Sequence, residues 1–191
     1  MVDVIGANLT VAKWSIDDYH RMIEAEILIG RKVELLDGYI LEMSPEGPLH
    51  KDSGEGLVNY LRQRLGDKAW VREAGPITLE NSEPEPDIAV VQSPRSRYRD
   101  HHPYPEEIFW LIEISNSTLS KDLTEKKRIY AQSGIPEYWV VAIKNREVYV
   151  FRDAVDGDYQ YGEKFSTGTL KPIAFPEIEI SLESLWSGDI Y

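Results

Sequence analysis

The feature that most restricts the fold is an apolar run at residues 108–114, IFWLIEI, in which Glu113 is the only charged residue. A run this short and this apolar is typical of a central strand that is covered on both faces of its sheet. A second such run, EYWVVAI at residues 137–143, comes after a segment in helical register, residues 121–133, that stops at Gly134. We therefore expect a buried sheet with covering helices.

The remaining elements follow from hydrophobic periodicity and turn residues. In chain order they are a helix at 14–29, a β-hairpin at 33–43 turning at Asp37-Gly38, a helix at 52–65, strands at 69–79 and 87–91, a hairpin of 147–153 with 159–165, and a helical turn at 181–186. This order favours a layered α/β fold with accessory β-hairpins at both ends. A length of 191 residues suits a single domain over residues 1–191.

The chain contains no cysteine, which excludes disulfides, thiolate metal sites and thiol nucleophiles. Any metal must therefore be bound by oxygen or imidazole. The opening residues MVDVIGANLT show no basic segment leading into an apolar run, and no stretch approaches 18 consecutive apolar residues. We expect a cytoplasmic protein without a membrane segment.

Two acidic residues lie at the ends of neighbouring apolar strands. Asp87 follows Pro84 and Pro86, which cannot donate hydrogen bonds to a sheet, so it is placed near the start of its strand. Glu113 lies just before residues 115–118, which are typical of a loop or the start of a helix. A carboxylate in an apolar strand is costly unless a partner such as Mg²⁺ neutralises it. We predict that Asp87 and Glu113 bind a divalent metal for phosphodiester hydrolysis; the alternative is a turn cap and an arginine partner.

Lys126 is the basic residue that the following helix turns toward the sheet. At about 100° per residue, the buried stripe of that helix is defined by Leu123, Ile129 and Tyr130. Lys126 falls inside this stripe, while Lys127 lies at its margin. Beside two acids, Lys126 could orient water or stabilise charge on phosphorus, held by Asp122 one turn earlier. The alternative is a lysine whose stem covers apolar surface. Tyr130 is assigned to the core.

A family resemblance rests on four segments in order: PEPDIAVV, LIEIS, DLTEKKRIY and GIPEYWVV. Together with the VELLDGYILEMSP hairpin, His50, YRDHHP and the AFPEIEI tail, they resemble the Uma-type putative restriction endonuclease family of the PD-(D/E)XK nuclease superfamily. The resemblance covers most of the chain. It implies a restriction-endonuclease-like mixed central sheet flanked by helices, and Mg²⁺- or Mn²⁺-dependent cleavage of DNA.

The superfamily pattern can be compared with this sequence position by position. Asp87 matches the acid after proline at the start of one strand, and Glu113 matches the acid on the next. Ser115 stands where the pattern has lysine, which is a departure from it. The resemblance implies that Lys126 on the following helix supplies the missing lysine, in agreement with its helical face.

The resemblance also suggests two residues near the first hairpin. It implies Glu34 as a further metal ligand or a base that positions water. The alternative is that Glu34 is a solvent-facing strand residue. His50 likewise has two interpretations, one as part of the site and one as a hydrogen-bonding residue at the start of a helix.

DNA is the predicted partner, although the formal charge of −12 opposes binding to a polyanion. Binding depends on where the positive residues gather. The densest positive stretch is PRSRYRDHH at residues 94–102, with Arg95, Arg97, Arg99, His101 and His102 around Tyr98. Arginine interleaved with aromatic residues suits phosphate and base contact. The alternative is a solvated charged loop.

Two classes of function follow from these observations. The first is a metal-dependent endonuclease, in which a homodimer would provide two sites for two strands. The second is a non-catalytic binding or assembly module with a nuclease fold, which Ser115 and the acidic charge favour. Hydrolysis of a smaller phosphoester is a third possibility, because its metal chemistry would be similar.

Overall fold

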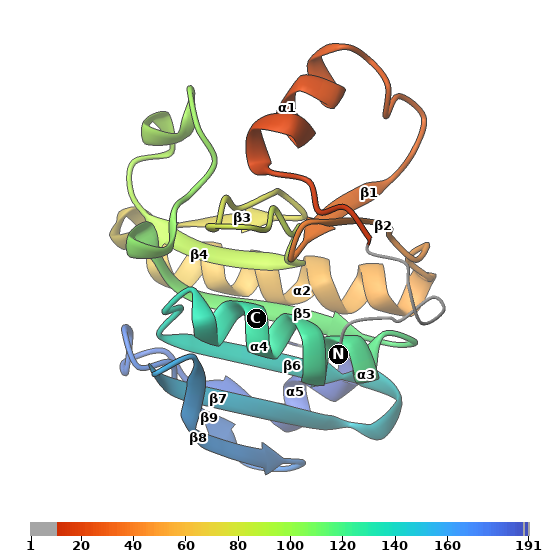
Figure 1. The fold of residues 1–191 in the computed structure, drawn as a ribbon. Coiled ribbons are helices and arrows are strands. Elements are labelled where there is room, and N and C mark those ends of the chain that lie inside the picture. Colours follow the sequence, from red (N-terminus) through yellow and green to blue (C-terminus); the bar gives the residue numbers. More distant parts are fainter. Residues whose placement is uncertain (1–10, 189, 191) are drawn as a thin grey trace.

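The computed structural model describes residues 11–188 and 190, and its helices and strands form a layered α/β fold (Figure 1). The strands are β1 Val33–Leu36, β2 Tyr39–Glu42, β3 Ala69–Glu73, β4 Ile88–Gln92, β5 Ile108–Ser115, β6 Glu137–Ala142, β7 Glu147–Val155, β8 Asp158–Phe165, β9 Thr169–Leu170 and β10 Ile180–Ser181. The α-helices are α1 Ile16–Glu24, α2 Pro48–Leu65, α3 Leu119–Lys121, α4 Lys127–Gln132 and α5 Leu182–Ser187. A π-helical segment, η4 Asp122–Lys126, joins α3 to α4.

The central sheet is mixed, with the strand order β3-β4-β5-β6-β7-β8. Strands β5 and β6 are parallel, and every other neighbouring pair in this sheet is antiparallel. Parallel strands need a long crossover, which the helical segment from α3 to α4 provides. All six residues of β6 are buried, as are all but Phe109 in β5, so the two apolar runs form the centre of the sheet.

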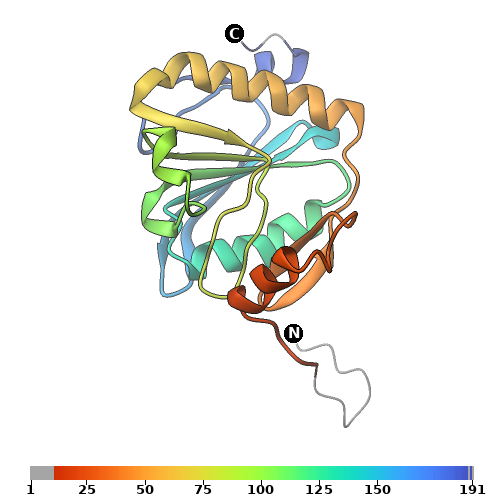
Figure 2. The ribbon, with the colours of Figure 1, turned by 90° about the horizontal axis from the view of Figure 1, so that it is seen from above.

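Helices cover both faces of this sheet (Figure 2). Alternate strand residues point to opposite faces. Ile88, Trp110 and Ile112 pack with α2 and α5, whereas Ala89 and Leu111 pack with α4. By the same alternation, Asp87 and Glu113 belong to the face that α3, η4 and α4 cover.

Two elements are shorter than predicted. The first helix ends at Glu24 rather than at residue 29, because the chain beyond it turns through Glu26 with φ +59°. Its later apolar residues, Ile23 and Ile27, are 49% and 65% exposed, so they have no surface against which a longer helix could pack. The strand predicted at 69–79 ends at Glu73, where Ala74 takes a positive φ of +44°.

Other elements extend beyond the predicted bounds. Helix α2 begins at Pro48 rather than at residue 52, since proline is well suited to a first helical turn. The hairpin of 147–165 does not stand apart from the sheet, because β7 pairs with β6 and β8 with β7. The first hairpin is confirmed as a separate two-stranded sheet, β1-β2, and β9 with β10 forms another.

The opening segment 1–10, in which no leader was recognised, lies outside the described residues. Among the described helices, none combines the length and the apolar character that a membrane span requires. The single domain and the cytoplasmic location stay predictions.

Candidate active site

The register of β4 and β5 brings the two predicted acids together. Ile88 lies opposite Ile112 in this antiparallel pair, so Asp87 and Glu113 are the next residues along. Asp87 Oδ2 accepts a hydrogen bond of 2.6 Å from the Ile114 backbone N–H. The carboxylate of Asp87 is therefore fixed to the strand that carries Glu113, rather than capping a local turn.

Glu113 is buried, and its described neighbours donate hydrogen bonds to only one of its two carboxyl oxygens. Its side chain is 4% exposed, and Oε1 accepts hydrogen bonds from Lys126 Nζ at 2.9 Å and Tyr130 OH at 2.7 Å. Burial raises the pKa of Glu113 to about 8, and Asp87 adds to this effect while Lys126 opposes it. Its cationic partner is a lysine, so the interpretation of Glu113 as an arginine's partner is wrong.

Lys126 reaches the sheet as its helical position predicts. Its side chain is 4% exposed, and Nζ lies 2.9 Å from Glu113 Oε1 and 3.5 Å from Glu34 Oε2. Burial alone would lower the pKa of Lys126, but the two carboxylates outweigh this and raise it, so the ammonium stays charged. A lysine with its charged end in solvent is therefore not what the structure shows.

Asp122 accepts a hydrogen bond from Ser115 instead of pairing with Lys126. The Ser115 hydroxyl donates to Asp122 Oδ2, which also accepts from Thr118 Oγ1 at 2.7 Å. These bonds tie the start of the covering helix to the end of β5. Asp122 makes no ion pair with Lys126, so the prediction that it holds the lysine is wrong; Glu113 and Glu34 do so instead.

Glu34 comes to the site from β1 and is fully buried. Its Oε1 accepts a hydrogen bond of 2.8 Å from Lys121 Nζ, and its Oε2 lies 3.4 Å from the Glu85 backbone N–H. Although burial opposes ionisation, Lys126 and Lys121 keep the pKa of Glu34 below its ordinary value. The interpretation of Glu34 as solvent-facing is wrong. Both of its oxygens are engaged, so it is better placed to position Lys126 than to bind a metal.

His50 touches the site directly. It lies in the first turn of α2, and its Nε2 is 3.2 Å from Asp87 Oδ2. The hydrogen bond that His50 donates to the Asp87 carboxylate raises the pKa of His50, against the effect of burial. Its buried Nδ1 has no hydrogen-bond partner in the described part of the chain, and the nearest acid, Glu46, has Oε2 at 3.8 Å.

A cavity of about 50 Å³ lies between these groups and is lined by Glu34, His50, Glu85, Asp87, Glu113 and Lys126, among others. Within the described residues, no hydrogen bond or ion pair uses Asp87 Oδ1 or Glu113 Oε2. Two hard oxygens are thus free beside a space that suits one ion with little water.

The donor set fits Mg²⁺ or Mn²⁺ better than zinc. The described residues hold no group of three or more His, Asp or Glu side chains arranged to enclose a metal. Zinc sites normally take three or four protein ligands, whereas Mg²⁺ is commonly held by one or two carboxylates, with water and substrate phosphate completing its shell. Asp87 and Glu113 match the second pattern.

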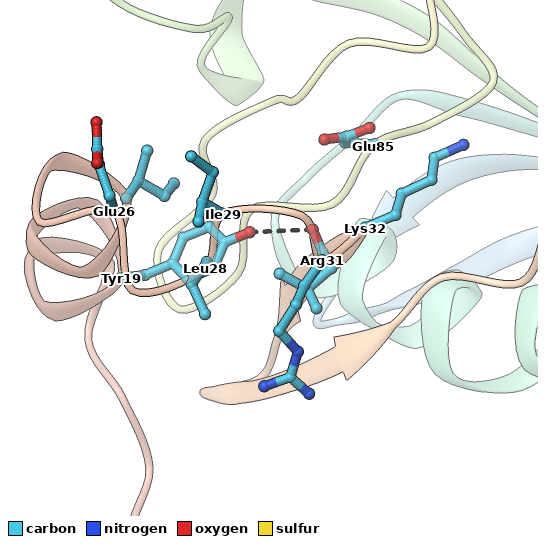
Figure 3. Close-up of a pocket in the computed structure, with 9 residues that line it drawn as sticks. Tyr19, Glu26, Leu28, Ile29, Arg31, Lys32 and Glu85 are labelled. Carbon is cyan, nitrogen blue, oxygen red and sulfur yellow. Dashed lines mark hydrogen bonds between the residues drawn. The ribbon is translucent and has the colours of Figure 1, made fainter.

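Glu85 is a candidate that the sequence interpretation missed. It lines the cavity, makes no ion pair with a described residue, and has a pKa raised mainly by burial, which are properties of a group that can accept a proton. It also lines a second hollow of about 380 Å³, where Figure 3 shows its carboxylate beside Lys32 and across from Tyr19. Residues 83, 85 and 87 alternate along an extended, proline-rich segment, which could have revealed that Glu85 accompanies Asp87.

The basic segment 94–102 does not line the acidic cavity. Part of it forms the wall of a separate cleft with Ile16, Asp17 and His20 of α1. The structure therefore separates the predicted acidic centre from the predicted nucleic-acid contacts.

Comparisons with known proteins agree with this arrangement. The family model Uma2, described as "Putative restriction endonuclease", matches residues 16–183. A crystal structure of "a putative nuclease belonging to DUF820" from Anabaena variabilis ATCC 29413 superposes with a TM-score of 0.69 and 18% identity, covering 91% of this chain and 98% of that chain. No curated protein matches. The expected nuclease-like mixed α/β fold and the family resemblance are confirmed.

Proposed function

The chain belongs to the Uma2 family, whose description is "Putative restriction endonuclease", and on this premise we propose a divalent-metal-dependent endonuclease that hydrolyses phosphodiester bonds in DNA. The observation that carries the proposal is the pair of free carboxylate oxygens, on Asp87 and Glu113, beside the buried ammonium of Lys126. Two acids and one lysine around a small cavity are suited to phosphoryl chemistry.

Asp87 and Glu113 would hold the metal, with Mg²⁺ or Mn²⁺ as the ions that the oxygen donors suit. When bound, the ion would act as a Lewis acid on the phosphate. Asp87 is oriented for this by the Ile114 backbone and by His50. Glu113 is oriented by Lys126 and Tyr130, which occupy its other oxygen. Residues that orient ligands in this way influence metal affinity and activity strongly.

Lys126 would stabilise the charge that develops on phosphorus. Its ammonium is kept protonated by Glu113 and Glu34 and is shielded from bulk water, so its field is strong. In the reaction, the oxygen of water bonds to phosphorus as one P–O ester bond breaks, and the leaving oxygen takes up a proton from solvent. Glu85 is placed to take the proton that the water loses, because its carboxylate lines the same cavity and has a raised pKa.

Of the two observations that favoured a non-catalytic module, Ser115 and the acidic charge, the first no longer does so. Ser115 stands at the lysine position of the superfamily pattern, but Lys126 lies beside Glu113 and supplies a lysine to the site. The acidic net charge still favours this module. In so acidic a chain, basic residues without an acidic partner indicate where DNA could bind. A homodimer stays a prediction.

The proposal is tested by incubating supercoiled plasmid DNA with the protein in Mg²⁺, Mn²⁺ or EDTA. We expect nicking or linearisation only with metal, and a loss of at least about 10²-fold in Asp87→Ala, because the metal contributes several kcal/mol of charge stabilisation. Cleavage that is absent in the wild type, or that is indifferent to Asp87→Ala, contradicts the proposal.

Neighbouring lysines provide a matched pair for the role of Lys126. Lys126→Met should lower the rate by about 10²–10³-fold, as expected for the loss of one charge-stabilising group. Lys127→Met should change it little, because Lys127 pairs with the exposed Asp158 at 2.9 Å on the surface. Equal effects of the two substitutions would show that Lys126 has no special role.

A further inference from the structure

A second cleft, which shares no lining residue with the acidic cavity, contains aromatic, basic and acidic side chains. The α1–loop cleft has a volume of about 460 Å³ and lies between Ile16, Asp17 and His20 of α1, Thr78, and residues 98–102 with Tyr104. Figure 1 shows α1 and the segment between β4 and β5 rising at the β3 end of the sheet. The volume is within the range of pockets that hold small organic ligands.

The rings of Tyr98, His101 and Tyr104 line one wall of this cleft, and Trp70, which is not part of the lining, stacks on Tyr98. Trp70 and Tyr98 stack with ring centroids 5.4 Å apart, and His101 and Tyr104 stack at 5.0 Å with planes 14° apart. Tyr98 meets His101 edge-on at 5.7 Å and so joins the pairs. Tyr104 is 41% exposed, so the series ends on a ring that another flat ring can reach.

Three arginines next to this wall have no acidic partner. Arg72, Arg95 and Arg99 make no ion pair with any described carboxylate, although the chain has 33 acidic residues and only 21 basic ones. The guanidinium carbon of Arg72 lies 5.2 Å from the ring centroid of Trp70 and 5.9 Å from that of Tyr98. Its buried Nη1 has no hydrogen-bond partner in the part of the chain described. Exposed cations left unpaired in an acidic protein, here Arg95 and Arg99, are available to a phosphate backbone.

The hollow shown in Figure 3 differs from this cleft because its basic residues have acidic partners. Its two cations are paired, Arg31 with Glu42 at 2.9 Å and Lys32 with Glu46 at 2.6 Å. An anionic ligand there would have to displace a carboxylate from each cation. The α1–loop cleft is thus the better candidate for a nucleic-acid strand.

The polar groups inside the cleft suit a base rather than a phosphate. Asp17 and Asp100 would repel an anion that entered. Thr78 offers its hydroxyl oxygen as an acceptor, because the hydroxyl hydrogen is donated to Glu83. Burial lowers the pKa of His102, which keeps its ring neutral with one donor and one acceptor. A base can use such groups while its backbone stays near Arg99, which lines the cleft, and Arg95, which does not.

A short segment of chain links the cleft to the acidic centre. Glu83 Oε2 accepts a hydrogen bond of 2.9 Å from Thr78 Oγ1 and lies 2.7 Å from His20 Nε2. Both Thr78 and His20 line the cleft. Asp87 is four residues further on, a span of at most about 14 Å. That distance corresponds to about four base steps along one strand, so one DNA strand can reach both places.

We propose that the α1–loop cleft binds an unstacked base of a single-stranded DNA segment, a few nucleotides from the phosphate that is cut. The ring of Tyr104 stacks on the base, and Arg95 and Arg99 contact the flanking phosphates. A paired base in a duplex keeps both of its faces covered by its neighbours, so the cleft selects DNA with unpaired nucleotides beside the cleavage point. The position relative to the cut rests on the proposed nuclease function, whereas binding of the base does not.

The test is the affinity of the full chain for a labelled 12-nucleotide single strand, measured by fluorescence anisotropy in EDTA so that no cleavage occurs. Tyr104→Ala should weaken binding about 5- to 150-fold, the range found for loss of one stacked base. Tyr161→Ala is the matched control, because Tyr161 is on β8 at the far edge of the sheet, and it should bind like the wild type.

Salt dependence separates the arginines from the ring. Arg99→Gln should reduce the slope of log affinity against log salt by about 0.7, the value for one phosphate contact on a single strand. Arg146→Gln, which changes an exposed arginine that also has no described acidic partner but lies outside the cleft, should leave the slope unchanged. Equal slopes for the two variants would overturn the assignment of Arg99.

The outcomes distinguish this inference from the proposed function. If the wild type cuts DNA with metal but Tyr104→Ala binds normally, or if a blunt duplex binds as tightly as the single strand, the cleft inference is wrong and the nuclease proposal stands. If the single strand binds in a Tyr104-dependent way but no metal produces cleavage, the cleft inference stands and the nuclease proposal falls.

Discussion

Two glutamates on adjacent central strands, Glu113 on β5 and Glu137 on β6, are both buried and differ in how they are satisfied. Glu137 Oε1 accepts hydrogen bonds from Trp139 Nε1 and Arg152 Nε, both at 2.8 Å, and Oε2 accepts from the Ile173 backbone N–H at 2.6 Å. Glu113 receives both of its hydrogen bonds on Oε1, and its Oε2 has none from the described residues.

The difference shows how a structural buried acid can be told from one that serves a site. Burial raises the pKa of both residues, so depth and pKa alone do not separate them. Glu113 lines a cavity and has an oxygen without a described hydrogen-bond partner, whereas both oxygens of Glu137 are hydrogen-bonded. An acid whose hydrogen-bonding capacity is left incomplete is the one available to a ligand.

The largest expected effect is on stability. Glu137→Gln should lower the free energy of unfolding by about 3 kcal/mol, because it breaks a buried, fully bonded pair with Arg152. For a chain of this size that is roughly 6–12 °C in melting temperature. Glu113→Gln should cost less than about 1.5 kcal/mol, since Lys126 keeps Glu34 as a partner and an incompletely hydrogen-bonded acid is removed. Urea unfolding of both variants measures this, and equal losses would remove the distinction.

Metal binding should give the next effect, in the opposite direction. Mg²⁺ or Mn²⁺ at 100 times its dissociation constant should stabilise the wild type by about 2.7 kcal/mol, since a ligand that binds only the folded state must stabilise it. Glu137→Gln should retain this gain, and Glu113→Gln should lose it. Thermal unfolding with and without metal measures both, and a metal response that survives Glu113→Gln contradicts the site.

For each pH unit, the pH dependence is expected to be smaller. Glu113 has a folded-state pKa of about 8 against an ordinary 4.5, so between these values the folded chain holds a proton that the unfolded chain has released. The metal-free protein should therefore lose stability as pH rises from about 4.5 to about 8, by up to about 1.4 kcal/mol per pH unit from this group. Metal competes with that proton, so metal affinity should rise up to tenfold per unit until about pH 8.

Calorimetric titration of metal at pH 6, 7 and 8 checks this expectation. Glu137→Gln serves as the control and should show the same rise in affinity. A metal affinity that is flat over this range would mean that Glu113 is already ionised in the metal-free protein.

The smallest effect concerns the hydroxyl of Tyr130. Tyr130→Phe removes one donor to Glu113 Oε1 and should lower the free energy of unfolding by about 1 kcal/mol, because Lys126 still bonds that oxygen. Tyr149→Phe is the control: its hydroxyl bonds Glu147, which is itself paired with Lys164, and the change should be near zero. Chemical unfolding distinguishes the two, and a Tyr130→Phe loss above about 3 kcal/mol would mean that Glu113 depends on Tyr130 more than on Lys126.

The sequence determined much of this protein by itself. The apolar runs at 108–114 and 137–143 predict two central strands because only a doubly covered strand is apolar throughout. The proline–acid pattern at Asp87 and the helical phase of Lys126 likewise predict side chains that meet near Glu113. These inferences need only periods of two and 3.6 residues, which are local properties of the chain.

Only the tertiary structure decided the groups that complete the site. Glu34 arrives from a separate hairpin and His50 from the start of α2, so no local period relates either of them to Asp87. The structure also shows that Asp122 accepts a hydrogen bond from Ser115, and that one oxygen of Glu113 receives none from the described residues. Which hydrogen bonds a buried acid receives depends on how distant elements pack against it, and that is settled only when the sheet, the hairpin and the covering helices are assembled.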